Sequence, residues 1–204
     1  MKIENLAKPM ATAEGQARNE EVFRAAAELM TQKGFGGTSI GDIAKAVGMT
    51  KAGLYHHISS KQDMLYQILN YGMDLADSLV VKPTRDIADP EQRLREIVRR
   101  YARGLIESGT AFALLVSERK WLEPLEGEEF ERRVKGFRKY VMGTLEELDA
   151  KDRLYPQDIR ITTMHILRTI IGIAGWYSPQ FPADGDQIVE ETVSFALRAV
   201  LKPE

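Results

Sequence analysis

Five residues between positions 50 and 57 carry side chains suited to binding phosphate oxygens and other hydrogen-bonding groups. They supply a hydroxyl, an ammonium group, a phenol and two imidazoles, from Thr50, Lys51, Tyr55, His56 and His57. Hydroxyl and ammonium groups often bind phosphates, and a helix N-terminus adds its unpaired backbone N–H groups. A short helix has no core that needs so many polar groups, so we interpret them as a surface for a phosphate-bearing ligand.

The residues before and around this polar group predict two short helices joined by a tight turn. Ser39 with Asp42 three residues later fits a capping box at the start of the first helix. One face of that helix is apolar, at the i, i+3, i+4, i+7 positions Ile40, Ile43, Ala44 and Val47. Gly48 fits the turn, because glycine adopts positive φ without steric cost, and Thr50 can cap a second helix at residues 51–57. This is the helix-turn-helix pattern, whose second helix enters the major groove of DNA.

Lys61 begins the next expected helix, which runs over about residues 61–79 after a second capping box of Ser60 and Asp63. A cation at a helix N-terminus opposes the helix dipole unless an anion lies beside it. We therefore expect Lys61 to contact a phosphate as well.

The run of residues 33–65, KGFGGTSIGDIAKAVGMTKAGLYHHISSKQDML, resembles the DNA-binding region of the TetR/AcrR family of bacterial transcriptional repressors. The resemblance is specific over about residues 18–66, and Ile58 departs from it, since many members have an aromatic residue there. By position it implies a set of DNA contacts, mostly to phosphate, with Gly53 allowing close approach. The predicted DNA-binding residues are Ser39, Thr50, Lys51, Ala52, Gly53, Tyr55, His56, His57 and Lys61.

Composition and charge fit a globular protein and exclude several other classes. The 204 residues are 44% hydrophobic and 28% charged, with a net charge of −2. There is no cysteine, which excludes disulfides and thiolate metal sites and suits the reducing cytoplasm. No apolar run approaches the roughly 18 residues of a membrane span, and the first residues lack the apolar core of a signal peptide. We expect a cytoplasmic protein.

Helical periodicity continues through the rest of the sequence, so we expect an all-α fold of about nine helices. The first is expected at 17–33, and those after 61–79 at about 90–107, 110–121, 128–148, 156–177 and 186–201, with a proline-containing connector at 81–90. We expect Pro124 and Gly127 to interrupt the helices between residues 121 and 128. The chain divides into a flexible arm at 1–16, a helix-turn-helix domain at 17–62, and a helical ligand-binding and dimerisation domain at 63–204.

The last two expected helices, at about 156–178 and 186–201, carry a broad apolar face. Its residues are Met164, Ile166, Leu167, Ile170, Ile171, Ile173, Ile188, Val189, Val193, Phe195, Ala196 and Val200. In the resembled family these two helices pair with their symmetry mates, which implies a homodimer that reads a palindromic DNA operator. The alternative is that the face is internal core.

A repressor of this kind is expected to bind a small-molecule effector in a mostly apolar cavity of its C-terminal bundle. His165 and Arg168 lie at i and i+3, so we expect them to share a face, as an anchor for an anionic group or as ordinary core and rim residues. Residues 121–148 and 172–181 resemble family branches that respond to acyl-CoA thioesters or fatty acids. The candidate lining residues are Tyr101, Leu105, Phe112, Leu115, Trp121, Phe137, Tyr140, Met164, His165, Arg168, Trp176 and Tyr177.

No catalytic constellation stands out, and neither a cofactor nor a metal is expected. The glycines at 34, 36 and 37 are not followed by the GK[ST] of a phosphate loop, and the three histidines have no HExxH-like spacing. Three alternatives stay open: a helical hairpin without DNA, a helical adaptor that binds protein, and an enzyme that uses the C-terminal cavity. The adaptor would account for the bundle but not for the polar side chains of residues 50–61.

Overall fold

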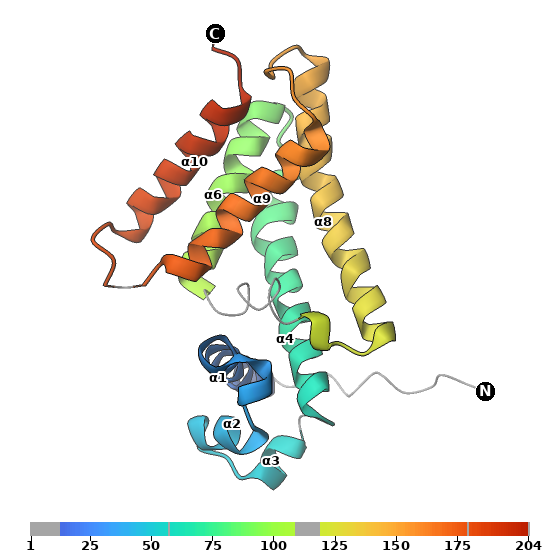
Figure 1. Ribbon diagram of the computed structural model, residues 1–204, viewed down its shortest axis with the longest axis vertical. Helices are drawn as coiled ribbons and strands as arrows, with labels where there is room; N and C mark the ends of the chain where they lie inside the picture. The colour runs from blue at the N-terminus through green and yellow to red at the C-terminus, as the bar shows by residue number, and fades with distance from the viewer. Residues whose placement is uncertain (1–12, 57, 109–118, 179, 204) are drawn as a thin grey trace, which may run out of the picture.

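The computed structural model describes residues 13–56, 58–108, 119–178 and 180–203, and these form two packed groups of helices (Figure 1). The smaller group contains α1 (Ala13–Gly37), α2 (Ile40–Ala46) and α3 (Lys51–Tyr55). The larger group contains α6 (Pro90–Ser108), α8 (Pro124–Ala150), α9 (Ile159–Trp176) and α10 (Gly185–Val200). The remaining long helix, α4 (Lys61–Ala76), runs from the small group into the large one.

The helix that begins with α4 is longer than the sequence predicts. It continues through a π-helical turn, Asp77–Val81, into the short α5, Lys82–Thr84, so the predicted connector at 81–90 is wrong in its first part. Proline lacks the N–H that a helix interior needs, and Pro83 lies two residues after the wider π turn, at the start of α5. Thr84 Oγ1 donates to the Val80 carbonyl at 2.7 Å.

Two other predicted boundaries are also wrong. Pro124 begins α8 instead of interrupting the chain, because the first helical turn has no partner for the missing N–H. Gly127 lies inside the same first turn. At the other end of the chain, α1 already starts at Ala13, so residues 13–16, assigned to a flexible arm, are helical.

The helix predicted at 110–121 falls largely on residues 109–118, which lie outside the described part of the chain. Its last residues form a 3₁₀ turn, Arg119–Trp121. Within the described residues the only strand-like feature is an isolated bridge between Leu154 and Leu201. None of the described helices is long and apolar enough to cross a membrane.

Buried apolar side chains form one continuous core through both groups of helices. In the large group α6 packs against α8, α9 and α10, and in the small group α2 packs against α1 and α3. The core passes from one group to the other along α4, whose Met64, Leu65, Ile68, Leu69, Met73 and Ala76 are all buried. The position of the small group is therefore tied to the large group through one helix.

Candidate functional site

The start of α2 is fixed by the predicted capping box. Ser39 Oγ accepts from the Asp42 backbone N–H at 3.1 Å, while the Ser39 N–H and hydroxyl both donate to Asp42 Oδ2, at 3.0 and 2.7 Å. The Ser39 hydroxyl is the main cause that lowers the pKa of the Asp42 carboxyl. Because the Ser39 hydroxyl already donates its proton to a hydrogen bond with Asp42, the main role of this side chain is to cap α2.

The turn between α2 and α3 also follows the sequence prediction. Gly48 has φ +64°, the left-handed conformation that glycine tolerates, and the Met49 N–H donates to the Ala44 carbonyl at 2.8 Å. Thr50 Oγ1 accepts from the Gly53 N–H at 3.0 Å and caps α3. This bond uses a lone pair of the exposed Thr50 hydroxyl and leaves its proton for a phosphate oxygen.

One side of α3 anchors the helix and the other is presented to solvent. Leu54 is buried, as is Ile58 just beyond the helix, so an aliphatic side chain fills the place where the resembled family often has an aromatic one. The exposed side consists of Lys51, Ala52, Tyr55 and His56, while Gly53 is half-buried. Among the predicted contacts, His57 lies outside the described residues.

Lys51 is positioned by a glycine on the neighbouring helix. A Cβ built on Gly41 would lie 2.7 Å from Lys51 Cε and 3.2 Å from Lys51 Nζ, so the lysine stem crosses α2 where that side chain is missing. The ammonium group is thereby kept near the N-terminus of α2, whose dipole favours an anion there.

Lys61, predicted to reach a phosphate, is instead turned toward the protein. Its Nζ donates to the carbonyls of Phe35, at 2.9 Å, and Thr38, at 3.0 Å, and lies 4.3 Å from the centroid of the Phe35 ring. Gly34, with φ +72° and ψ 159°, interrupts the helical backbone of α1 just before Phe35, so the Phe35 carbonyl lies after this kink. These carbonyls and the aromatic ring supply a negative partner for the cation at the start of α4.

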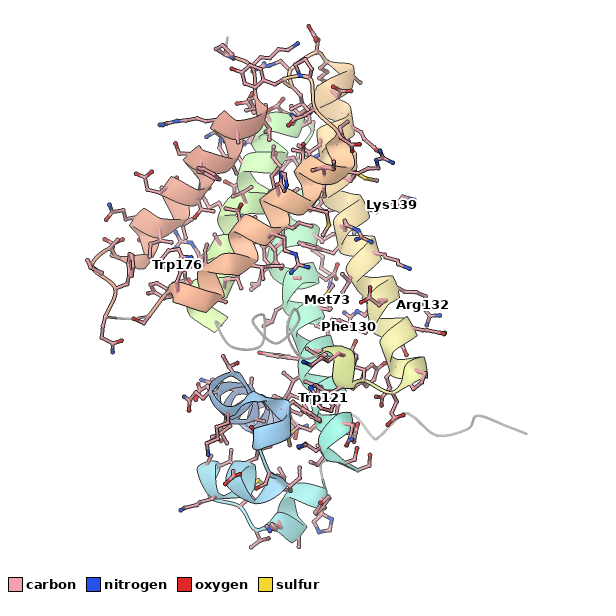
Figure 2. All side chains as sticks on the ribbon, in the orientation of Figure 1. Met73, Trp121, Phe130, Arg132, Lys139 and Trp176 are labelled. Carbon is pink, nitrogen blue, oxygen red and sulfur yellow. The ribbon has the colours of Figure 1, made fainter. Side chains whose placement is uncertain are left out.

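The Phe35 ring also joins the small group of helices to the large one. The ring centroids of Phe35 and Trp121 are 5.4 Å apart, with an interplanar angle of 33°. Figure 2 shows Trp121 at the boundary between the two groups of helices. Trp121 therefore packs on Phe35 at this boundary, and it is not among the residues that line the cavity between α4, α6, α8 and α9.

A cavity of about 200 Å³ lies inside the large group, between α4, α6, α8 and α9. Its lining is mostly apolar, with three charged side chains. Burial of Tyr101 raises the pKa of its hydroxyl, and the nearby positive charge of Arg168 lowers this pKa by a smaller amount. The lining residues are Met73, Tyr101, Glu131, Val134, Phe137, Arg138, Met164, Leu167, Arg168 and Ile171. Of the candidates named from sequence, Tyr101, Phe137, Met164 and Arg168 are brought together here.

The other described candidates lie elsewhere. Tyr140 lines a neighbouring cavity of about 220 Å³ and its hydroxyl is 2.8 Å from Thr84 Oγ1, whereas Leu105 is buried core. His165 and Trp176 line separate hollows beside α10. His165 and Arg168 lie at i and i+3 on α9 and are both exposed, but of the two it is Arg168 that lines the 200 Å³ cavity. Tyr177 is half-buried against the core and is not among the residues that line the 200 Å³ cavity. Phe112 and Leu115 lie outside the described residues.

Six lining residues were not among the candidates named from sequence: Met73, Glu131, Val134, Arg138, Leu167 and Ile171. Arg138 is part of a charged stretch of α8 that is typical of a solvated face, and its contact with Met164 depends on how α8 packs on α9. The spacing of residues 131, 134 and 138 does indicate that they lie on one face of α8 and so can line the same cavity.

The outer side of α9 and α10 is apolar, and Phe195 is the member of the predicted set that is exposed there. Most of the predicted set, including Ile166, Ile170, Val189 and Val193, is buried within the protomer, because α6 packs over it. The exposed apolar residues of this side are Ile161, Trp176, Phe181 and Phe195. Gly172 and Gly175 lie on α9 between Ile161 and Trp176, and both face open space.

Known proteins resemble this chain along most of its length. Residues 22–68 match the model of bacterial regulatory proteins of the tetR family, and residues 88–200 match that of the tetracyclin repressor-like C-terminal domain. The HTH-type transcriptional repressor KstR2 of Rhodococcus jostii (strain RHA1) is 28% identical over 198 residues, 94% of this chain and 95% of KstR2. The HTH-type transcriptional activator FasR of Mycolicibacterium smegmatis (strain ATCC 700084 / mc(2)155) is 25% identical over 181 residues, 88% of this chain and 81% of FasR. The crystal structure of AibR in complex with isovaleryl coenzyme A and operator DNA is 29% identical, with a TM-score of 0.79 over 87% of this chain and 97% of AibR.

The geometry of Lys61 predicts a stability effect that Lys51 should not share. Lys61→Met removes a charged donor from the carbonyls of Phe35 and Thr38, and we expect it to lower the free energy of unfolding by about 1–3 kcal/mol. Lys51→Met, on the exposed side of α3, should change the free energy of unfolding by no more than about 0.5 kcal/mol. Urea denaturation followed by circular dichroism measures both, and equal stabilities of the two variants would contradict a structural role for Lys61.

Proposed function

Because the chain belongs to the TetR family of bacterial regulatory proteins, we propose that it is a transcriptional repressor. It binds a palindromic DNA operator as a homodimer and releases it when a small molecule enters the C-terminal bundle. The observation that carries this proposal is the exposed polar side of α3, with Thr50, Lys51 and Tyr55 held beside a capped turn. The protein acts in the cytoplasm, where its DNA is, and it has no enzymatic role.

In this proposal α3 enters the major groove. The Thr50 hydroxyl and the Lys51 ammonium group bind phosphates at the groove edge, and Tyr55 and His56 face the bases or the backbone. Lys61 contributes indirectly, because it holds the loop before α2 against the start of α4. Phosphate contacts fix the orientation of the helix, and contacts to base edges supply sequence preference.

A single α3 of five residues reads too few base pairs to select one operator, so the proposal requires two copies. The exposed apolar side of α9 and α10, with Ile161, Trp176 and Phe195, pairs with its symmetry mate. A twofold interface uses the same patch on both chains and places the two α3 helices about one turn of DNA, or a multiple, apart.

The effector class that we propose is an acyl-CoA thioester. AibR, which this chain resembles in sequence and fold, has been crystallised with isovaleryl coenzyme A and operator DNA. The mostly apolar cavity of this chain is lined by Met73 of α4, and α4 carries the DNA-binding helices at its other end. An effector that binds better to the DNA-incompetent arrangement shifts the population toward it, by as much as its affinities for the two arrangements differ.

The DNA-binding role predicts a steep dependence on salt. With a duplex selected by the protein from a random-sequence pool, affinity should fall by at least about 10³-fold between 50 and 200 mM salt, because phosphate contacts release counterions. Lys51→Gln should weaken binding to all duplexes and reduce the slope of log affinity against log salt by about two, one phosphate contact per protomer. Fluorescence anisotropy measures both.

The matched control for this experiment is Lys151→Gln, which removes the same charge at the C-terminal end of α8, in the bundle. It should bind like the wild type. A flat salt response of the wild type would overturn the proposal that the protein binds DNA.

The dimer interface can be tested by one substitution on α10. Phe195 is 62% exposed in the protomer, so Phe195→Asp should leave the fold intact but prevent an apolar interface from forming. We expect light scattering to give twice the chain mass of 23.0 kDa for the wild type and the single mass for the variant. Tyr55→Asp, at an aromatic position of α3 that is 53% exposed, should lose DNA binding and remain dimeric. A wild-type protein that is monomeric at micromolar concentration would refute the interface.

Effector release is tested on the operator complex. Isovaleryl coenzyme A should lower operator affinity by about 5–150-fold, the usual range of coupling between two sites. Coenzyme A without an acyl group should have a much smaller effect, because nothing fills the apolar cavity. The measurement is anisotropy of the labelled duplex, and unchanged operator affinity at a concentration that saturates the protein would refute this effector class.

A further inference from the structure

Many arginines of the large helix group are held in ion pairs that join its helices or loops. Among the described residues, ion pairs join Arg93 to Glu147, Arg99 to Glu190, Arg103 to Asp186, Arg133 to Asp74 and Arg153 to Glu91. Arg138 and Arg168 form no ion pair with a described carboxylate. Both line the cavity between α4, α6, α8 and α9.

These two guanidinium groups come from facing helices. Arg138 is on α8, and its Nη1 contacts Met164 Sδ at 3.8 Å, although a thioether is a weak acceptor. Arg168 is on α9, is exposed, and is close enough to Tyr101 to lower the pKa of its hydroxyl. Their donors are therefore available to a ligand with several acceptor oxygens.

The surface next to them adds positive charge. The α8 segment 132–139 contains five cations and no acid, namely Arg132, Arg133, Lys135, Arg138 and Lys139. Lys135 is exposed and lies on the same helix face as Arg138, at i and i+3. Glu131 is the carboxylate among the described lining residues, so the lining has a net positive charge. Arg132 and Lys139 lie along the outer side of α8 in Figure 2.

We propose that Arg138 and Arg168 form an anion-binding mouth of the effector cavity, with Lys135 at its rim. This inference rests on the proposed function, since it assigns how the effector of that function is recognised. Arginine binds phosphate and carboxylate oxygens in charge-assisted, often bidentate hydrogen bonds. The anionic end of the effector lies between the two arginines, and its apolar end lies inside, against Met73, Val134 and Phe137.

The size of the cavity agrees with an effector whose apolar end lies inside and whose anionic end stays at the mouth. Its volume of about 200 Å³ has room for about seven groups of the size of a water molecule. A short acyl group fits inside, whereas the nucleotide part of an acyl-CoA must stay at the mouth and outside it. The anionic groups held there are phosphates if the effector is the thioester, or a carboxylate if it is the free acid.

The experiment measures binding of three compounds by isothermal titration calorimetry to the full-length protein. They are isovaleryl coenzyme A, isovaleryl pantetheine, which keeps the thioester but has no phosphate, and isovalerate. Wild-type protein should bind the coenzyme A thioester at least about 100-fold more tightly than the pantetheine thioester, as expected for charge-assisted bonds from two arginines.

Arg138→Gln and Arg168→Gln should each lose about 10-fold in affinity for isovaleryl coenzyme A and almost nothing for isovaleryl pantetheine. Arg132→Gln is the matched control, because it removes the same charge from the same segment of α8 but does not line the cavity. It should bind all three compounds like the wild type. Operator binding without effector should be unchanged in all three variants, which shows that they are folded.

The outcomes separate this inference from the proposed function. Tight, arginine-dependent binding of isovalerate would support the mouth and assign it to a carboxylate. Unchanged affinity of Arg138→Gln and Arg168→Gln for isovaleryl coenzyme A would overturn it, even if that compound still releases the operator. Failure of the wild type to bind any of the three compounds would also overturn it, whereas the DNA-binding proposal is tested separately by the salt dependence.

Discussion

One helix, α4, belongs to both packed groups, and the rest of the structure depends on that constraint. Its first half buries Met64, Leu65 and Ile68 in the small group, where it packs against α1, and its second half buries Met73 and Ala76 in the large group, where it packs against α8. Close-packed interiors resist small displacements. A tilt of α4 caused at the cavity must therefore carry α1, α2 and α3 with it, or break contacts in one of the two groups.

A second contact between the groups makes this connection more specific. Trp121 packs on Phe35, and Lys61 binds both the Phe35 ring and its carbonyl. Lys61 also binds the carbonyl of Thr38, the residue before the cap of α2. The same lysine is the first residue of α4, so a movement of either α4 or Trp121 reaches the start of α2 through a short chain of direct contacts.

The sequence predicted the small group in detail because its determinants are local. The Ser39–Asp42 box, the positive φ of Gly48 and the Thr50 cap each involve residues within a few positions, and all three are confirmed. The carbonyl partners of Lys61 could not be predicted in this way, because they are 23 and 26 residues away. In the large group, helical periodicity identifies an apolar face but not the helix that covers it. For that reason Ile170 and Val193 were assigned to an interface although they are buried under α6, and Arg138 was not connected with Arg168.

The distribution of ion pairs explains why an anion between Arg138 and Arg168 would matter. The pair of Arg93 and Glu147 joins α6 to α8, and that of Arg99 and Glu190 joins α6 to α10. In the described part of the chain no ion pair joins α9 to another helix, since the pair of Arg160 and Asp158 is local to its own N-terminus. An anion held by Arg138 of α8 and Arg168 of α9 would add this missing link. α9 also carries the exposed apolar residues Ile161 and Trp176. In the proposed dimer, the position of α9 relative to α8 would therefore set how the two protomers meet, and with it the spacing of their α3 helices.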